Sequence, residues 1–440
     1  MGQNMKKYIS PDPTGTVSDA QMLQQAIDQA SEEGVGCVVI PRINPRTGQP
    51  CYLIGEPLLL PSDMEIVLNH CYLKLEDGMV GNIFRNRNMF GPDFGKASSE
   101  QQNIIIRGEG HAVLDGAGHN DIFEWSSVKD GNPHVCNNNL ILFHNVDHFA
   151  VENIEVRNQR WWALNFIYCS NGYIADIVSR AKAEFSNQDG INLRSGCHHI
   201  VIERISGCSG DDFIALSAIG HRRYYQTPVE GKEDSIHDVV IRDIIGTSAH
   251  EGIVTLRCHD EREMYGIQIE NIMESDFGDR NYLPYGTILV GQNYFFAQNM
   301  GAHGCTHHID VDTVYTASGG SSITVGNSLT DSSFTNIRAK NCINAVTTRN
   351  YDHRGSVEIV ERGYGEDGIK MERVRFEGIL AEASLKGSPI DFTVMRKEDY
   401  LSEVTISNLQ YEGPHPGILL NEEVKNDLIY KEGAESCLME

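Results

Sequence analysis

Three short polar segments in the middle of the sequence carry the residues best suited to chemistry. They are Asn187-Gln188-Asp189-Gly190-Ile191, Ser209-Gly210-Asp211-Asp212-Phe213 and Ala249-His250-Glu251-Gly252-Ile253. Cleavage of a glycosidic bond needs a protonated carboxyl group for the leaving oxygen and an ionised carboxylate that activates water or attacks the sugar. Crowded carboxyl groups resist joint ionisation, so at least one of them keeps its proton. The segments therefore indicate carboxylate acid–base catalysis by Asp189, Asp211 and Asp212, with His250 to tune or orient them.

The elements that would position these residues belong to a repeat. From about residue 138 a short β-branched pattern returns at intervals of 20–50 residues, which indicates a solenoid, propeller or array. Its best copies carry apolar residues at i, i+2 and i+5, and they end at Ile205, Ile244 and Ile272. Strands this short, with Asn, Asp, Ser and Gly at the corners and no intervening helices, predict an all-β right-handed parallel β-helix.

Stacking of the coils explains how the acidic residues would meet. Asp189 precedes Asp211 by one coil, and His250 follows Asp212 by one coil plus an insertion. A lone Asp in such a corner is most simply a turn former. An adjacent Asp pair with a third Asp one coil earlier costs Coulombic repulsion that a turn does not require, so we interpret the stacked set as catalytic.

The chain ends and insertions complete the predicted architecture. A helix is expected near the N-terminus, because Ser18 and Gln21 form a capping box and the apolar residues that follow have helical spacing. This N-terminal region, residues 1–45, would cap the core of a single β-helix domain spanning residues 1–440. Residues 221–234 and 282–308 interrupt the repeat and are predicted to be inserted loops over the cleft.

Composition narrows the range of partners. The chain has 440 residues with 61 acidic and 36 basic side chains, a formal net charge of −25, and such a surface repels nucleic acid and anionic membranes. No apolar stretch has the length of a membrane span, and no secretory signal follows the first lysines, so we expect a cytoplasmic protein. The eleven cysteines show no metal-ligand spacing. We expect no metal and no cofactor, and a homo-oligomer stays open.

The acidic segments also resemble those of a known family. Asn187-Gln188-Asp189, Gly210-Asp211-Asp212 and a His one coil later are similar to the motif series of the glycoside hydrolase family 28 polygalacturonases. The resemblance covers about residues 12–275. It implies an inverting hydrolase of pectin-related sugars in which Asp211 is the general acid and Asp189 and Asp212 activate water. His250 matches the family's histidine, although Ala249-His250-Glu251 replaces Gly-His-Gly.

The substrate-binding residues are less sharply defined by the pattern. The Arg-x-Lys motif with which the family grips a uronate is absent from the following coil, and the nearest basic residue is Arg257. A uronate held by Arg222, Arg223 or Arg257 and a neutral sugar both stay open. Further candidates for binding are Asn187, Glu251, Tyr224 and Trp162, the last either a sugar-stacking platform or a core residue.

Several functions are compatible with these features. The favoured one is a glycoside hydrolase acting on an oligosaccharide, exo-acting because long aromatic loops predict a closed pocket. Coil spacing alone, about 5 Å, favours retention, whereas the family resemblance favours inversion, which we expect. The alternatives are a polysaccharide lyase that binds Ca²⁺ and uses Arg257 as its base, a transglycosidase, and a non-catalytic glycan-binding solenoid.

Overall fold

The structure is a computed structural model of the whole chain. It describes residues 7–12, 14, 17–123, 135–182, 185, 187–219, 227–259, 262–275, 283–291, 304–353, 359–362, 369–393 and 399–430. The chain divides into two compact units. Unit 1 comprises Met1–Ala181, Gly196–Val201 and Arg222–Glu233, and unit 2 comprises Lys182–Ser195, Ile202–His221 and Asp234–Glu440. The single domain expected over residues 1–440 stays a prediction.

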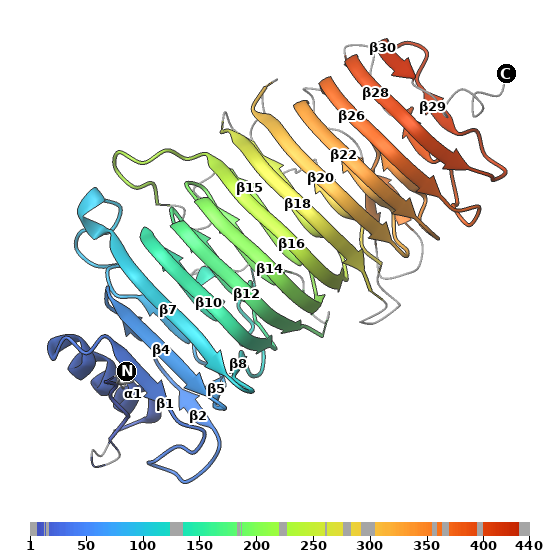
Figure 1. Cartoon of the computed structure of the whole chain (residues 1–440). Coiled ribbons are helices and arrows are strands. Elements are labelled where there is room, and N and C mark those ends of the chain that lie inside the picture. The colour runs from blue at the N-terminus through green and yellow to red at the C-terminus, as the bar shows by residue number, and fades with distance from the viewer. Residues whose placement is uncertain are drawn as a thin grey trace, which may run out of the picture. The chain divides into compact units, whose positions relative to one another are not determined.

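Unit 1 begins with the helix predicted from the capping box. Helix α1 (Asp19–Glu32) has Ser18 as its N-cap: the Ser18 hydroxyl accepts from the Gln21 backbone N–H at 3.2 Å, and the Gln21 side chain accepts from the Ser18 N–H at 3.2 Å. Leu23 and Ile27 are fully buried on the face that packs against the first strands. Figure 1 shows α1 beside β1, as expected for a cap of the first coil.

The rest of unit 1 consists of short strands. They are β1 (Cys37–Ile40), β2 (Tyr52–Ile54), β3 (Leu58–Leu60), β4 (Met64–Asn69), β5 (Tyr72–Leu75), β6 (Phe84–Asn86), β7 (Gln101–Glu109), β8 (Val113–Asp115), β9 (Ile141–His144), β10 (Val146–Arg157), β11 (Leu164–Ile167) and β12 (Ser170–Arg180), with 3₁₀ turns at Ala97–Ser99 and Val135–Asn138. Neighbouring strands of successive coils are parallel, as in the pairs β1–β4, β4–β7, β7–β10 and β10–β12. Strand β14 (His198–Ser209) has residues in both units.

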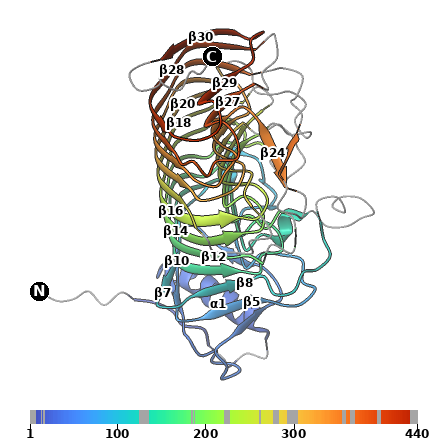
Figure 2. The same ribbon diagram turned by 90° about the vertical axis from the view of Figure 1, so that its right-hand side faces the viewer.

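Unit 2 contains two parallel sheets and one antiparallel hairpin. Sheet A is formed by β16 (Ile236–Ser248), β18 (Met264–Glu274), β20 (Thr306–Thr316), β22 (Leu329–Ala339), β26 (Lys370–Ala381), β28 (Tyr400–Tyr411) and β30 (Lys425–Tyr430). Sheet B is formed by β13 (Ile191–Arg194), β15 (Ile214–Ala218), β17 (Gly252–Cys258), β19 (Gly286–Val290), β21 (Ser321–Val325), β23 (Asn344–Thr347), β27 (Ile390–Phe392) and β29 (Ile418–Leu420). The hairpin joins β24 (Asn350–His353) to β25 (Ile359–Arg362), and Figure 2 shows β24 beside the coils.

The apolar repeat accounts for the coils of sheet A. In β18, Ile267, Ile269 and Ile272 are buried, and each lies in register with an apolar residue of β20. The step from i+2 to i+5 breaks the alternation of a regular strand because Asn271 takes the left-handed conformation with φ 55°. Asp243 occupies the same place in β16 with φ 57°, and Asn and Asp tolerate this conformation better than other side chains. The fold is therefore the right-handed parallel β-helix predicted from the repeat.

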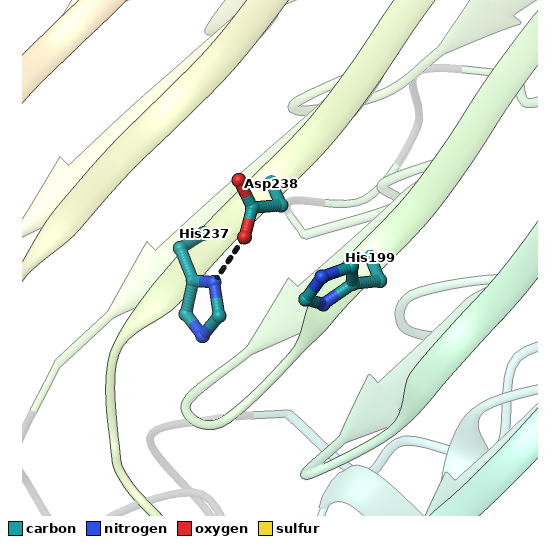
Figure 3. Close-up of side chains that lie close together, drawn as sticks. All are labelled: His199, His237 and Asp238. Carbon is teal, nitrogen blue, oxygen red and sulfur yellow. Dashed lines mark hydrogen bonds and ion pairs between the residues drawn. The ribbon is translucent and has the colours of Figure 1, made fainter.

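Polar side chains on the outside of sheet A illustrate the structural use of acidic residues. At the start of β16, His237 Nδ1 and Asp238 Oδ2 lie 2.8 Å apart (Figure 3). The His237 ring stacks on Tyr265, and Tyr265 stacks on His307, with interplanar angles of 2°. Asp238 has a φ of 52°, so this carboxylate belongs to a corner that favours Asp for its backbone conformation.

One predicted insertion requires correction. Residues 282–308 include β19, whose Ile288 pairs with Val254 of β17 and with Ile323 of β21, so this part is a regular strand of sheet B. The aromatic and Gly-rich surroundings concealed the short β-branched run of the strand. Residues 292–303 lie outside the described residues, as do residues 221–226 of the other predicted insertion. Within the described residues, no helix has the length and apolar character needed to span a membrane.

Candidate active site

The three polar segments each lead directly into a strand of sheet B. Asp189 precedes β13, Asp211 and Asp212 precede β15, and His250 and Glu251 precede β17. Because the three strands are parallel neighbours, their preceding turns lie at one edge of the sheet. All of these residues belong to unit 2. The sequence-based expectation that the coils bring these segments together is therefore met within one unit.

The register of the strands decides which residues face one another. Ile191 pairs with Ile214, and the Gly190 N–H donates to the Asp212 carbonyl oxygen at 3.0 Å, so Asp189 lies beside Asp212. A Cβ at Gly190 would lie 2.4 Å from the Phe213 carbonyl oxygen. Glycine is therefore needed for this close approach of the two coils.

Between β15 and β17, the register differs from the one that the sequence-based prediction assumed. Ile214 pairs with Val254, and counting back along both strands from this pair places Glu251 rather than His250 level with Asp211. The Phe213 N–H donates to the Gly252 carbonyl oxygen at 3.0 Å, in agreement with this register. His250 lies one position earlier, half-buried in the turn before β17. The sequence shows that residues are inserted after β15, but it does not show how many of them lie outside the regular coil, so it does not fix the register of β17 on β15.

Backbone groups hold the Asp211 carboxylate. The Asn187 N–H donates to Oδ2 at 2.8 Å and the Asp212 N–H donates to Oδ1 at 3.1 Å. Asn187 has a φ of 62°, a left-handed conformation that Asn tolerates. The Asp211 carbonyl oxygen accepts from the hydroxyls of Ser209 and Ser248, at 2.5 and 2.7 Å. Because both ends of the residue are held, its carboxyl group has a defined direction.

Asp212 forms a buried ion pair. Arg257 Nη1 donates to Asp212 Oδ2 at 2.6 Å, and the Thr255 hydroxyl donates to Oδ1. The side chains of Arg257 and Asp212 are only 8% and 4% exposed. The second terminal nitrogen of Arg257 lies 3.7 Å from Glu251 Oε2. Hydrogen bonds accepted by both oxygens, one from a guanidinium, are the pattern of an ionised carboxylate.

Asp189 is held by a residue of its own strand. Its Oδ2 accepts from the Asn192 side-chain amide at 3.0 Å, and the residue is 3% exposed. Burial raises the pKa of Asp189 well above the usual range, and the charges of Asp211 and Asp212 raise it further. The Asn192 hydrogen bond and the charge of Arg257 act in the opposite direction on this pKa.

Asp211 is perturbed in the same direction. Loss of contact with water raises the pKa of Asp211 well above its usual range, and the charges of Glu251 and Asp212 add to this effect. Arg257 and the Asn187 N–H lower that pKa in part. Two neighbouring carboxyl groups with raised pKa values and a third in an ion pair are the arrangement that supplies a proton donor and an acceptor together.

The same carboxylates were the metal ligands expected of a lyase. Asp211, Asp212 and Glu251 each offer an oxygen, and these oxygens lie within 4.8 Å of one another. A calcium ion binds six to eight oxygens. Here the guanidinium of Arg257 already faces two of the three carboxylates, and Asp211 retains its proton more readily than an ordinary carboxyl group. The donor set as it stands therefore fits a cation poorly.

The remaining predicted binding residues are distributed differently. Trp162 belongs to unit 1, is 5% exposed and packs on Trp161 with ring centroids 5.2 Å apart, the burial expected of a core residue. Arg222, Arg223 and Tyr224 lie outside the described residues. Asn187, Glu251 and Arg257 are thus the predicted binding residues that the structure brings to the carboxylates.

Sequence reasoning missed three residues that contact this group of carboxyl-bearing residues. Asn192 and Thr255 point to the same side of sheet B as Arg257 and donate to Asp189 and Asp212. Ser248 donates from its hydroxyl to the Asp211 carbonyl and accepts from the Glu251 N–H at 3.0 Å. The sequence does contain a signal for Asn192 and Thr255. Each alternates with Ile, Val or Leu residues of its strand, and a polar residue in such an alternation points away from the core.

Comparison with known proteins agrees with the fold and with the acidic motifs. Residues 91–222 match the family described as glycosyl hydrolases family 28, and this segment contains Asp189, Asp211 and Asp212. The fold is similar to that of the family 28 exopolygalacturonase of Yersinia enterocolitica, with a TM-score of 0.54, 12% identity and coverage of 96% of this chain and 78% of that one.

Two other solved structures share the fold with different described activities. The A-module of the Azotobacter vinelandii mannuronan C-5 epimerase AlgE6 has a TM-score of 0.52 and 14% identity, with coverage of 96% of this chain and 97% of that one. The tailspike protein of E. coli bacteriophage HK620 has a TM-score of 0.52 and 13% identity, covering 96% and 76%. The family match therefore supports the assignment of an activity, which the fold alone does not. On this evidence the chain is a glycoside hydrolase similar to members of family 28.

Proposed function

We propose that this protein hydrolyses a glycosidic bond in a pectin-related oligosaccharide, with Asp211 as general acid and with Asp189 and Asp212 holding the attacking water. The observation that carries the proposal is the convergence of three buried or half-buried carboxyl groups, two of which have strongly raised pKa values. The family match over residues 91–222 and the likeness to the Yersinia enterocolitica exopolygalacturonase support the pectin-related substrate.

The proposed reaction balances within these groups. Asp211 gives its proton to the glycosidic oxygen as the bond from that oxygen to the anomeric carbon breaks. Water attacks the anomeric carbon and loses its proton to an ionised carboxylate. Asp212 is suited to this role because it forms an ion pair with Arg257 and accepts a hydrogen bond from Thr255. The donors on Asn192 and Asn187 would keep the other two carboxyl groups in place.

Stereochemistry and cleavage mode are part of the proposal. Oxygens of Asp211 and Asp212 lie within 4.8 Å, a separation that by itself favours retention, whereas the family resemblance favours inversion, which we propose. We also propose exo cleavage. Proton NMR of the first product anomer tests inversion, and the length distribution of early products tests exo cleavage, because an exo enzyme shortens the chain by one end unit at a time.

The decisive experiment compares wild type with Asp211→Asn in a reducing-sugar assay on neutral and uronic oligosaccharides. We expect a loss of at least about 10³-fold in kcat, in line with the loss of general acid catalysis, with an unchanged circular dichroism spectrum. Asp243→Asn is the matched control, because Asp243 is a corner residue on the outside of β16 that accepts from Asn271 at 3.0 Å. Undiminished turnover by Asp211→Asn would contradict the proposal.

A calcium-dependent lyase is the second candidate, favoured by the three oxygens within 4.8 Å of one another. Elimination would give an unsaturated, UV-absorbing product and would stop when calcium is chelated. We expect instead that excess EDTA leaves the rate unchanged and that no unsaturated product forms. A chelator-sensitive reaction with such a product would replace the hydrolase by the lyase.

A further inference from the structure

Negatively charged side chains outnumber positively charged ones around the catalytic carboxylates. Within the described residues, four acidic side chains meet there, and the cation whose charge acts on both Asp189 and Asp211 is Arg257. Even when Asp189 and Asp211 keep their protons, Asp212 and Glu251 outnumber this guanidinium. Among the residues that the structure describes, the net charge at this site is therefore negative before any substrate arrives.

Arg257 is not placed to neutralise a second carboxylate. Its two terminal nitrogens face Asp212 at 2.6 Å and Glu251 at 3.7 Å, and its side chain is 8% exposed. A substrate carboxylate would have to compete with Asp212 and Glu251 for this guanidinium, and a close contact with it would draw the guanidinium away from Asp212. That would strip a buried carboxylate of its partner, which is strongly unfavourable.

The other buried arginine on this side of sheet B is displaced. Arg194 of β13 lies in register with Ser217 of β15, and Ser217 lies in register with Arg257 of β17. Two strand spacings, about 10 Å, therefore separate the backbones of the two arginines. Arg194 is buried and lies on the strand that follows Asp189, two strands away from the strand of Arg257.

We propose that the sugar ring seated over Asp189, Asp211, Asp212 and Glu251 is uncharged at C6, as in a neutral hexose or an esterified uronic acid. This inference rests on the proposed glycoside hydrolase function and specifies its substrate. A free carboxylate about 5 Å from one net negative charge, at an effective dielectric constant near 20, would bind roughly 100-fold more weakly. The absence of an Arg-x-Lys motif from the coil that follows His250 agrees with a ring that needs no such grip.

A matched ligand series tests this directly. Oligogalacturonide, its methyl ester and its carboxyl-reduced form have the same length and linkage and differ only at C6. Their dissociation constants with Asp211→Asn are measured by calorimetry, and their kcat/KM values are measured with wild type. We expect both neutral members to bind roughly 100-fold more tightly than the free acid, and the better of the two identifies an esterified or a neutral natural substrate.

The outcomes separate the inference from the proposed function. Equal binding of the three, preference for the free acid, or no measurable binding would overturn the inference. Tight binding of the neutral members without hydrolysis by wild type would uphold the inference and refute the hydrolase.

A charge variant adds a second readout. Glu251→Gln removes the one net negative charge of the site, so the preference for the neutral members should fall from roughly 100-fold to near equality. Glu270→Gln, on the exposed side of β18, should leave the preference unchanged. An unaltered preference in Glu251→Gln would show that charge at this site does not select the substrate.

Discussion

Replacement of Arg257 by Gln should affect both stability and the pH dependence of catalysis. The guanidinium lies 2.6 Å from Asp212, and both side chains are less than one-tenth exposed. Removing one partner leaves a buried carboxylate uncompensated, which typically costs about 3–5 kcal/mol. The charge of Arg257 also lowers the pKa values of Asp189 and Asp211, so its loss should raise both further.

Two measurements check this prediction. Urea denaturation at neutral pH should show the loss of stability, and Arg257→Gln/Asp212→Asn should recover part of it, because Asp212 is then uncharged while buried Glu251 still lacks the nearby guanidinium. The profile of log kcat/KM against pH should move as a whole to higher pH. Arg338→Gln is the matched control, because Arg338 pairs with Glu382 at 2.9 Å while 56% exposed, and exposed pairs contribute about 0–1 kcal/mol.

A specific result would refute the reasoning. If Arg257→Gln lost less than about 1 kcal/mol, far below the cost of a broken buried pair, and kept the wild-type pH profile, the ion pair would neither stabilise the protein nor tune the carboxyl groups. A loss of stability that the double variant did not recover would assign the effect of Arg257 to packing rather than to charge.

Three further predictions concern the individual carboxyl groups. Asp211→Asn should stabilise the fold at neutral pH. The pKa of Asp211 is raised in the folded state, so the contribution of the protonated Asp211 to stability is fully present below about pH 4 and is lost as pH rises through the folded pKa. An Asn at this position has no such loss. Urea midpoints across pH check this, and equal or lower stability than wild type at neutral pH would contradict it. Glu251→Gln removes a charge that raises the pKa of Asp211, so the alkaline limb of the rate profile should move to lower pH; an upward move would be inconsistent. Asn192→Ala removes a hydrogen bond that lowers the pKa of Asp189, so the rate profile should move to higher pH, and an unchanged profile would exclude Asp189 from the pair that sets it.

The two raised pKa values belong to a coupled pair. As pH rises, the first proton lost from Asp189 and Asp211 adds a second ionised carboxylate beside Asp212 to hold the attacking water, and the second loss removes the acid. A bell-shaped profile follows, and its two apparent pKa values describe the pair rather than either residue.

The local patterns of the sequence determined the coils and the identity of the catalytic candidates. The spacing i, i+2, i+5 predicted the buried residues of sheet A because alternation and one left-handed corner residue are properties of a short stretch of chain. The capping box predicted the start of α1 for the same reason. The segments around Asp189, Asp211 and Asp212 were recognisable because carboxyl groups at coil spacing have few structural uses.

Tertiary structure alone decided how those residues meet. The sequence placed His250 one coil after Asp212, whereas the pairing of Ile214 in β15 with Val254 in β17 puts Glu251 level with Asp211. It left Arg257 open as a substrate-binding group, whereas the fold pairs Arg257 with Asp212. A shift of one residue in register exchanges the side chains that face one another, and the loop between two strands sets that register. The sequence specifies the length of the loop but does not reveal the path that the loop follows.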